Sequence, residues 1–144
     1  MENKTILITG GASGIGLAIV EKFATNGSQV FLIDFNKTEG TRVEKSGREK
    51  GWKVTFLHAD IQDEQQVIQA VQSIPGKLDV LVNNAGLEYI TPITDPSERV
   101  DEMFRRIVEI NVIGTFSVTR QLLPKIPDFY LSLILLAYPQ GADG

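Results

Sequence analysis

Residues 6–20 read ILITGGASGIGLAIV, an apolar run that passes through glycines into a segment of helical period. Gly10, Gly14 and Gly16 stand where a buried strand would turn into a helix. Glycines there allow a tight turn and a close approach of backbone to a ligand, and a helix N-terminus attracts phosphate. No acidic residue occurs in this helix before Glu21. The stretch predicts a phosphate-binding turn, with a purely steric use of glycine as the open alternative.

Apolar runs of strand length alternate with helical segments, a pattern typical of βαβ units and a parallel sheet covered on both faces. The predicted strands are Thr5–Thr9, Val30–Ile33, Val54–Leu57 and Val80–Val82. The predicted helices are Ile15–Thr25, 36–50, Glu64–Ser73 and a long pattern from Pro96 to Leu123, which we expect to bend near Gly114. In the first helix, the residues expected to share one face are Ile15, Ala18, Ile19 and Phe23. The fold class predicted is α/β, a Rossmann-type doubly wound parallel sheet of about four to five strands.

The character of the sequence changes after Pro124, where only three residues are charged. The stretch FYLSLILLAY at 129–138 predicts either a fifth buried strand or an apolar tail. We therefore expect one Rossmann domain over residues 1–124 and a divergent apolar tail over 125–144.

Composition narrows the classes of function. The 144 residues include 18 acidic and 14 basic side chains, and the net charge of -4 disfavours a nucleic-acid partner. There is no cysteine, and the one histidine, His58, is expected to be structural, so we expect no metal site. No signal peptide or apolar run of roughly 20 residues is present. These features favour a soluble cytoplasmic protein without a membrane partner.

Asp34 ends the second predicted strand, 18 residues after Gly16. A dinucleotide-binding fold places there the carboxylate that binds the adenosine ribose hydroxyls. An ordinary polar residue at the end of a strand is the alternative.

Five signatures in this order resemble those of the short-chain dehydrogenase/reductase family. They are TGGASGIG at 9–16, Asp34, AD at 59–60, NNAG at 83–86 and Asn111. The resemblance covers roughly residues 5–124 and implies a dinucleotide-binding domain. It also implies hydride transfer between a nicotinamide cofactor and an alcohol or carbonyl substrate.

The resemblance assigns roles to particular residues. Asp34 matches the ribose-binding acid, and Asp60 with Ile61 matches the position that holds adenine, where the carboxylate accepts from the exocyclic amine. The alternative for Asp60 is the N-cap of the helix from Glu64, for which Asp63 is better placed. The residues that match the coenzyme loop are Thr9, Gly10, Ser13, Gly14, Ile15 and Gly16.

Two further matches lie later in the chain. Asn83, Ala85 and Gly86 resemble the motif after the fourth strand, which steadies the sheet and lines the coenzyme cleft. For Asn83, a purely structural strand-end cap is the alternative. Asn111 matches the helix asparagine that holds a water in the family's proton relay, and it is the only relay candidate.

Cofactor preference follows from Ser13 and Asp34 together. Relatives that prefer NADP generally carry a basic residue in the glycine loop or just after the second strand, whereas these positions hold a serine and a carboxylate. Lys37 is the nearest basic residue after the strand. The resemblance therefore implies NAD(H) as the cofactor.

The family's catalytic pair, a tyrosine four residues before a lysine on one helix face, does not occur in the sequence. The three tyrosines and the residues four positions later are Tyr89 and Ile93, Tyr130 and Ile134, and Tyr138 and Ala142. We therefore expect an NAD(H)-binding protein with little or no turnover, which has a small-molecule substrate only if it is active. The alternatives are an active oxidoreductase that uses non-standard residues, and a non-catalytic truncated product or interaction module.

The later strands and helices of the family have no counterpart in these 144 residues. We therefore expect exposed apolar surface at the sheet edge and along the helix at 100–123. Such surface favours self-association.

Overall fold

The computed structural model describes residues 3–89, 98–126 and 132–134. Its strands are β1 (Thr5–Thr9), β2 (Gln29–Asp34), β3 (Val54–His58), β4 (Val80–Asn83) and β5 (Ser132–Ile134). They form one parallel sheet in the order β3-β2-β1-β4-β5. The predicted parallel α/β sheet is confirmed. Three residues of the apolar stretch form a fifth strand, and the rest of that stretch lies outside the described residues.

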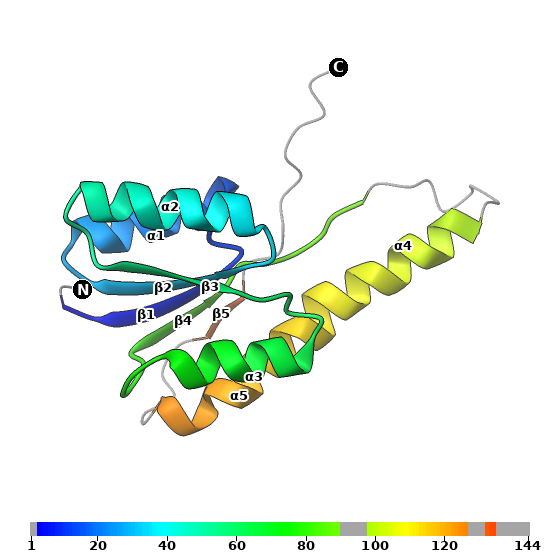
Figure 1. The fold of residues 1–144 in the computed structure, drawn as a ribbon. Helices are drawn as coiled ribbons and strands as arrows, with labels where there is room; N and C mark the ends of the chain where they lie inside the picture. Colours follow the sequence, from blue (N-terminus) through cyan, green and yellow to red (C-terminus); the bar gives the residue numbers. More distant parts are fainter. Residues whose placement is uncertain (1–2, 90–97, 127–131, 135–144) are drawn as a thin grey trace, which may run out of the picture.

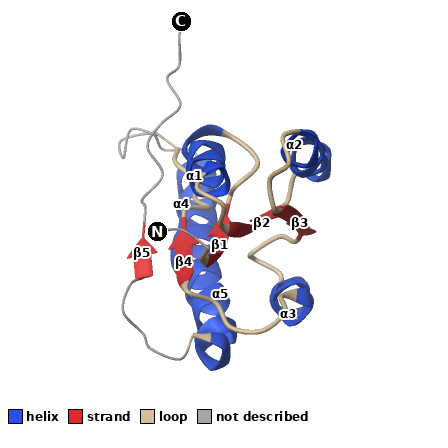
Figure 2. Ribbon diagram, turned by 90° about the vertical axis from the view of Figure 1, so that its left-hand side faces the viewer, coloured by secondary structure: helices blue, strands red, loops and turns tan. Residues whose placement is uncertain are grey.

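Helices cover both faces of the sheet, with α1 and α2 on one side and α3 and α5 on the other (Figure 1, Figure 2). The strand order reverses between β1 and β4, which makes this the switch point of the doubly wound fold. The helices are α1 (Gly14–Thr25), α2 (Lys37–Glu49), α3 (Glu64–Ser73), α4 (Glu98–Val108) and α5 (Thr115–Leu122), with the π-helical turn η1 (Glu109–Gly114) and the 3-10 turn η2 (Leu123–Lys125).

Successive residues of β1 enter two different apolar layers. Leu7 packs in the layer beneath α3 and α5, whereas Ile6 and Ile8 pack in the layer beneath α1 and α2. All three side chains are fully buried. Because strand side chains alternate in direction, a strand covered on both faces must be apolar throughout, which explains why β1 is a continuous apolar run.

The buried face of α1 differs from the prediction. Its buried residues are Gly16, Val20 and Ala24, whereas Ile15 is nearly half-exposed and Ala18 is exposed. The prediction that Ile15 and Ala18 belong to the inward face was wrong. The helix approaches the sheet through its row of small residues, because its first turn lies directly against the loop after β1.

Two glycines bring α2 close to β3. A Cβ at Gly40 would collide with the ring of Phe56, and one at Gly47 would lie 3.1 Å from Val54 Cβ. The two glycines are two turns apart and therefore share one face of the helix. Charged side chains occupy much of the remaining surface, where Arg42 pairs with Glu39 at 2.7 Å, as expected for a solvated helix.

The long helical pattern is interrupted near the residue where we expected a bend. The π turn η1 ends at Gly114, and a Cβ at this glycine would lie 2.9 Å from side-chain carbons of Ile61. A π turn contains an extra residue, which rotates α5 relative to α4. Figure 1 shows α5 beside α3, whereas α4 projects away from the sheet. The start of the pattern at Pro96 lies outside the described residues.

Candidate dinucleotide-binding site

The residues expected to bind a cofactor gather at the carboxyl edge of the sheet. The glycine turn follows β1, Asp34 is the last residue of β2, Asp60 follows β3, and Asn83 ends β4. Open α/β sheets bind ligands at this edge, next to the switch point, which here lies between β1 and β4. Four separate stretches of sequence therefore border one region.

The glycine turn has a backbone that favours glycine. Gly10 and Gly14 have φ values of 66° and 52°, both in the left-handed region. The amide of Gly10 donates to the carbonyl of Ile33 at 2.8 Å, and a Cβ at Gly16 would collide with the carbonyl oxygen of Gly10. Within the described chain the N-cap Ser13 makes no side-chain cap hydrogen bond, and no acidic residue occupies the first turn of α1. The first amides of α1 are therefore left for an anionic ligand.

Asp34 fastens the glycine turn to the start of α2. Its side chain is only 8% exposed, and its Oδ2 accepts from the amide of Ala12 at 3.0 Å. Its Oδ1 accepts from the amide of Asn36, the N-cap of α2, at 2.9 Å. Each carboxylate oxygen can accept a second hydrogen bond, which leaves capacity for two ribose hydroxyls. Asp34 thus positions the turn in addition to the ligand role expected from the sequence.

Thr9 and Asn84 clamp the loops that follow β1 and β4. Thr9 Oγ1 accepts from the amides of Asn84 and Ala85 at 3.1 and 3.0 Å. Asn84 Nδ2 donates to the carbonyl oxygens of Thr9 and Gly10 at 3.1 and 3.0 Å. Sequence reasoning named Thr9 and Ala85 but missed Asn84. Its only signal was its place as the second asparagine of the NNAG stretch at 83–86.

Asn83 points to the opposite side from Asn84. Its side chain is buried, and its Nδ2 donates to Oγ1 of Thr119 on α5 at 3.1 Å. This contact supports the structural alternative for Asn83, since it joins β4 to a helix rather than to the glycine turn. Gly86 is exposed in the loop beyond.

Asp60 and Ile61 differ in exposure. Asp60 Oδ1 accepts from the amide of Gln62 at 3.0 Å, and Asp60 lies partly exposed. The N-cap of α3 is Asp63, as expected. The backbone amide of Gln66, and to a smaller extent its side chain, donate hydrogen bonds that lower the pKa of the Asp63 carboxyl below its ordinary value. Ile61 is only 7% exposed and belongs to the apolar core. The buried side chain of Ile61 is therefore not available for the contact with adenine that the resemblance implies.

Asn111 holds the loop after β4 against η1. Its Oδ1 accepts from the amide of Leu87 at 2.7 Å, and its Nδ2 donates to the carbonyl of Leu87 at 3.0 Å. This reciprocal pair imitates strand pairing and fixes the loop to the π turn. The side chain keeps one amide hydrogen and one lone pair for a water. Asn111 is thus a positioning residue in this structure.

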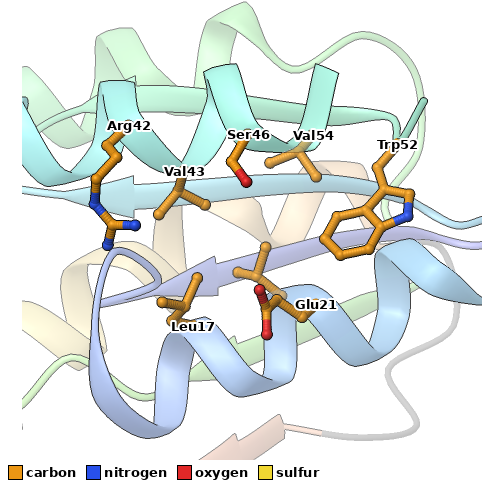
Figure 3. Close-up of a pocket in the computed structure, with 8 residues that line it drawn as sticks. Leu17, Glu21, Arg42, Val43, Ser46, Trp52 and Val54 are labelled. Atoms are coloured by element: carbon orange, nitrogen blue, oxygen red, sulfur yellow. The ribbon is translucent and has the colours of Figure 1, made fainter. Parts of the chain in front are cut away.

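A small crevice lies elsewhere, between α1 and α2 (Figure 3). Its volume is about 30 Å³, room for about two water molecules. Lys50 contacts two of its lining residues, with Nζ 3.6 Å from Glu21 and 4.4 Å from the centre of the Trp52 ring. The crevice is too small for a dinucleotide and is separate from the carboxyl edge of the sheet.

Two kinds of feature do not occur in the part of the chain that the structure describes. No three histidine, aspartate or glutamate side chains lie close enough together to hold a metal ion there. No helix among the same residues combines the length and apolar character needed to cross a membrane.

Large exposed apolar side chains are frequent along α4, η1, α5 and η2, and we call this group of residues the α4–α5 face. Its members, each half-exposed or more, are Phe104, Val112, Ile113, Phe116 and Leu123. The predicted apolar exposure along this helix is confirmed. The structure does not describe the side chains of β5, so the expected apolar exposure at the sheet edge stays a prediction. Self-association also stays a prediction.

Known proteins share this combination of sheet and loops. The family model described as short chain dehydrogenase matches residues 4–129. The chain belongs to the short-chain dehydrogenase family. Cyclopentanol dehydrogenase of Comamonas sp. is 39% identical over 123 residues, which are 83% of this chain and 48% of that protein.

Solved structures of short-chain dehydrogenases include both cofactor types. A 7α-hydroxysteroid dehydrogenase complexed with NADH and 7-oxo glycochenodeoxycholic acid has a TM-score of 0.77 and 32% identity, covering 86% of this chain and 48% of its own. A variant actinorhodin polyketide ketoreductase with NADPH has a TM-score of 0.77 and 29% identity, covering 85% and 48%. The chain spans about half the length of the relatives it matches.

Proposed function

We propose that this chain binds NAD(H) at the carboxyl edge of its sheet and belongs to an oxidoreductase that transfers hydride between this cofactor and an alcohol or carbonyl substrate. The observation that carries the proposal is the hydrogen bond between the amide of Ala12 and the carboxylate of Asp34, 3.0 Å long. It joins the phosphate-binding turn directly to the ribose-binding acid, the two groups that a dinucleotide must contact together.

The proposed binding mode uses the groups already described. The pyrophosphate accepts from the first amides of α1, between Ser13 and Gly16, where the helix dipole adds favourable charge. The adenosine ribose donates from its hydroxyls to Asp34, and the adenine amine donates to Asp60. The hydrogen bonds between Thr9 and Asn84 hold the loops after β1 and β4 at a fixed distance from each other. The cleft therefore needs little rearrangement when the cofactor binds. Ala85 and Gly86 line the nicotinamide side.

Preference for NAD(H) over NADP(H) follows from the charge of Asp34. Its carboxylate is nearly buried, so a 2′-phosphate beside it would place two negative groups together with little solvent to screen them. Ser13 supplies no compensating positive charge.

Little or no turnover is expected from this 144-residue chain. General acid/base catalysis contributes roughly 10²- to 10⁴-fold and needs a group of suitable pKa within reach of the reacting oxygen. Since no tyrosine stands four residues before a lysine, the chain offers no such pair, and a water held by Asn111 has no tyrosine–lysine pair with which to exchange a proton.

Calorimetric titration of the purified chain tests the proposal. We expect NADH to bind more tightly than NADPH. We expect Asp34→Asn to weaken NADH binding and so to reduce the difference in affinity between the two cofactors. Equal affinity for both cofactors contradicts the preference, and the absence of binding contradicts the function. Robust NADH oxidation with a panel of ketones would show that other residues of the chain carry out catalysis.

A further inference from the structure

The strand β3 is the terminal strand of the sheet on the side away from β5 (Figure 2). One side of a terminal strand has amides and carbonyls that no neighbouring strand binds, so such an edge can pair with a strand of another molecule. Natural proteins reduce this risk with charged residues or proline in the edge strand. The sequence of β3, VTFLH, contains no lysine, arginine, acidic residue or proline. The strand itself therefore has none of these protecting residues.

Hydrogen bonds at the two ends of β3 show which of its residues face outward. The carbonyl of Lys53 accepts from the amide of Val30 at 2.8 Å, so Lys53 faces β2. The amide of Ala59 donates to the carbonyl of Asp34 at 3.2 Å, so Ala59 also faces β2. In a parallel ladder, the backbone groups of successive residues point to opposite sides of the strand. The amide of Phe56 therefore points away from the sheet.

Glu44 of α2 binds this outward amide. Its Oε1 accepts from the amide of Phe56 at 3.0 Å, and its side chain is only 28% exposed. Its Oε2 lies 4.0 Å from the guanidinium of Arg48. Just before the strand, the amide of Trp52 donates to the carbonyl of Gly47 at 2.8 Å. The helix thus binds two amides along the outer side of this segment.

The glycines of α2 allow the side chain of Glu44 to reach the strand. A Cβ at Gly40 would collide with the ring of Phe56, and one at Gly47 would lie 3.1 Å from Val54. Glu44 stands four residues after Gly40 and three before Gly47, so the three residues share one face of the helix. Because the helix lies so close to β3, the carboxylate binds the strand backbone directly.

We propose that Glu44 closes the outer edge of β3 to strand addition, and that the partner it excludes is a second copy of this chain. Two identical edges can pair about a two-fold axis, each contributing the same groups. The uncharged sequence of β3, rich in β-branched and aromatic residues, suits such a pair. Glu44 prevents the pairing because its carboxylate occupies the amide that a carbonyl of the second strand would need to bind.

The first test is hydrogen exchange of backbone amides, followed by NMR on the dilute, isotope-labelled chain. Glu44→Ala should speed exchange of the Phe56 amide by about tenfold or more, because a hydrogen bond to a charged group is lost. The amide of Thr55, which faces β2, is the internal reference for a change in global stability. An unchanged ratio of the Phe56 rate to the Thr55 rate overturns the proposal.

Two control variants separate the hydrogen bond from the charge. Glu44→Gln removes the charge but keeps an oxygen acceptor, so it should retain most of the protection of the Phe56 amide. Glu49→Ala removes an exposed carboxylate from the same helix and should leave this protection unchanged. If Glu44→Gln loses as much protection as Glu44→Ala, the charge and not the hydrogen bond is responsible, and the assignment is contradicted.

The second test is self-association, measured by sedimentation velocity over a range of concentrations. Each variant is compared with the wild type, so that association through the α4–α5 face is common to both. Glu44→Ala should lower the dissociation constant by about tenfold or more, since the freed amide gains a partner. Glu44→Gln and Glu49→Ala should match the wild type. Equal association of Glu44→Ala and the wild type overturns the exclusion of a second copy.

Hydrogen exchange at high concentration locates the new contact. In associated Glu44→Ala, carbonyls of the second β3 should bind the freed amide, so the exchange of Phe56 should slow again as the concentration rises. In the wild type, this rate should not depend on concentration. Association of Glu44→Ala that leaves the Phe56 rate unchanged shows pairing elsewhere and overturns β3 as the contact. Neither test involves NADH, so the result is independent of the proposed function.

Discussion

The carboxyl edge of the sheet and the α4–α5 face are two exposed regions with opposite chemistry. At the carboxyl edge, side chains are engaged with backbone groups of other loops, as in the two bonds from Asn84 to Thr9 and Gly10. On the α4–α5 face, large apolar side chains such as Phe104 and Phe116 are more than half-exposed. A polar network with fixed geometry suits a small polar ligand, whereas an apolar surface suits a protein partner.

This difference indicates that the two regions contribute to separate properties. Contacts at the carboxyl edge should govern cofactor affinity, and the α4–α5 face should govern association. The four predictions that follow test this separation, from the largest expected effect to the smallest.

The largest effect is expected for Gly16→Val. The added side chain would collide with the carbonyl of Gly10 and with Nδ2 of Asn84, so the first turn of α1 must shift. Overpacking of this kind costs about 1–3 kcal/mol or more. Thermal unfolding should show this loss, and NADH binding should disappear. Ala18→Val, on the exposed side of the same helix, is the control and should retain both properties.

The next effect compares the two neighbouring asparagines. Asn84→Ala removes two hydrogen bonds from the glycine turn and should cost about 1–3 kcal/mol, with a clear loss of NADH affinity. Asn83→Ala breaks the contact with Thr119 on α5 and should lower stability while largely preserving affinity. Denaturant unfolding and calorimetry on both variants measure the two quantities. If the two variants lose the same stability and the same NADH affinity, the separate roles of Asn83 and Asn84 on the two faces of β4 are contradicted.

A smaller effect is expected for truncations on the α4–α5 face. If copies of the chain associate through this face, Phe116→Ala should raise the dissociation constant of the complex by roughly 10- to 150-fold, because each buried ring contributes roughly 1.5–3 kcal/mol. Analytical ultracentrifugation measures the change. Phe35 is also exposed but directly follows β2 at the carboxyl edge, so Phe35→Ala is the matched control and should leave association unchanged. A wild-type chain that stays monomeric at high concentration contradicts the prediction.

The smallest effect concerns Asp79, at the amino edge of the sheet. The amide of Thr5 donates to Asp79 Oδ2 at 2.8 Å, and Lys4 pairs with Asp79 Oδ1 at 3.1 Å. The hydrogen bond from Thr5 and, to a smaller extent, the one from Lys4 lower the pKa of Asp79 below its ordinary value of 3.8. A carboxyl with a lowered folded pKa stabilises the fold above its unfolded pKa, and the contribution is lost as the pH falls through the folded pKa. Both side chains are partly open to solvent, with 46% and 40% of their surface exposed, so screening keeps the effect small.

Unfolding measured from neutral to acidic pH tests this expectation. Asp79→Asn should be slightly less stable than the wild type at neutral pH, and the difference should vanish well below pH 3.8. NADH affinity should not change, because Asp79 lies at the opposite end of β4 from the cofactor loops. A difference that grows on acidification has the wrong sign and contradicts the assignment.

Much of the fold could be predicted because β1, β2 and β4 are mostly buried on both faces and therefore consist largely of apolar residues. The apolar stretch at 129–138 was ambiguous, since such a run suits a buried strand or a tail equally well. Periodicity also misassigned Ile15, because the first turn of α1 is set by a close contact between Gly16 and Gly10, which a hydrophobic pattern does not report.

The candidate site was predicted through residues whose type matches a ligand group, such as Asp34. The missed residue, Asn84, acts through a contact across a long sequence separation, since it bonds to Thr9, 75 residues away. Such roles depend on strand order and register, which local pattern does not determine.

Amide chemical-shift mapping tests most directly whether the carboxyl edge is the cofactor site. With an isotope-labelled chain, NADH should shift the amide signals of Gly14, Ile15 and Asn36, while those of Val43 and Ser46, which line the crevice between α1 and α2, stay in place. Shifts confined to the α4–α5 face, or no shifts at saturating NADH, would contradict the account.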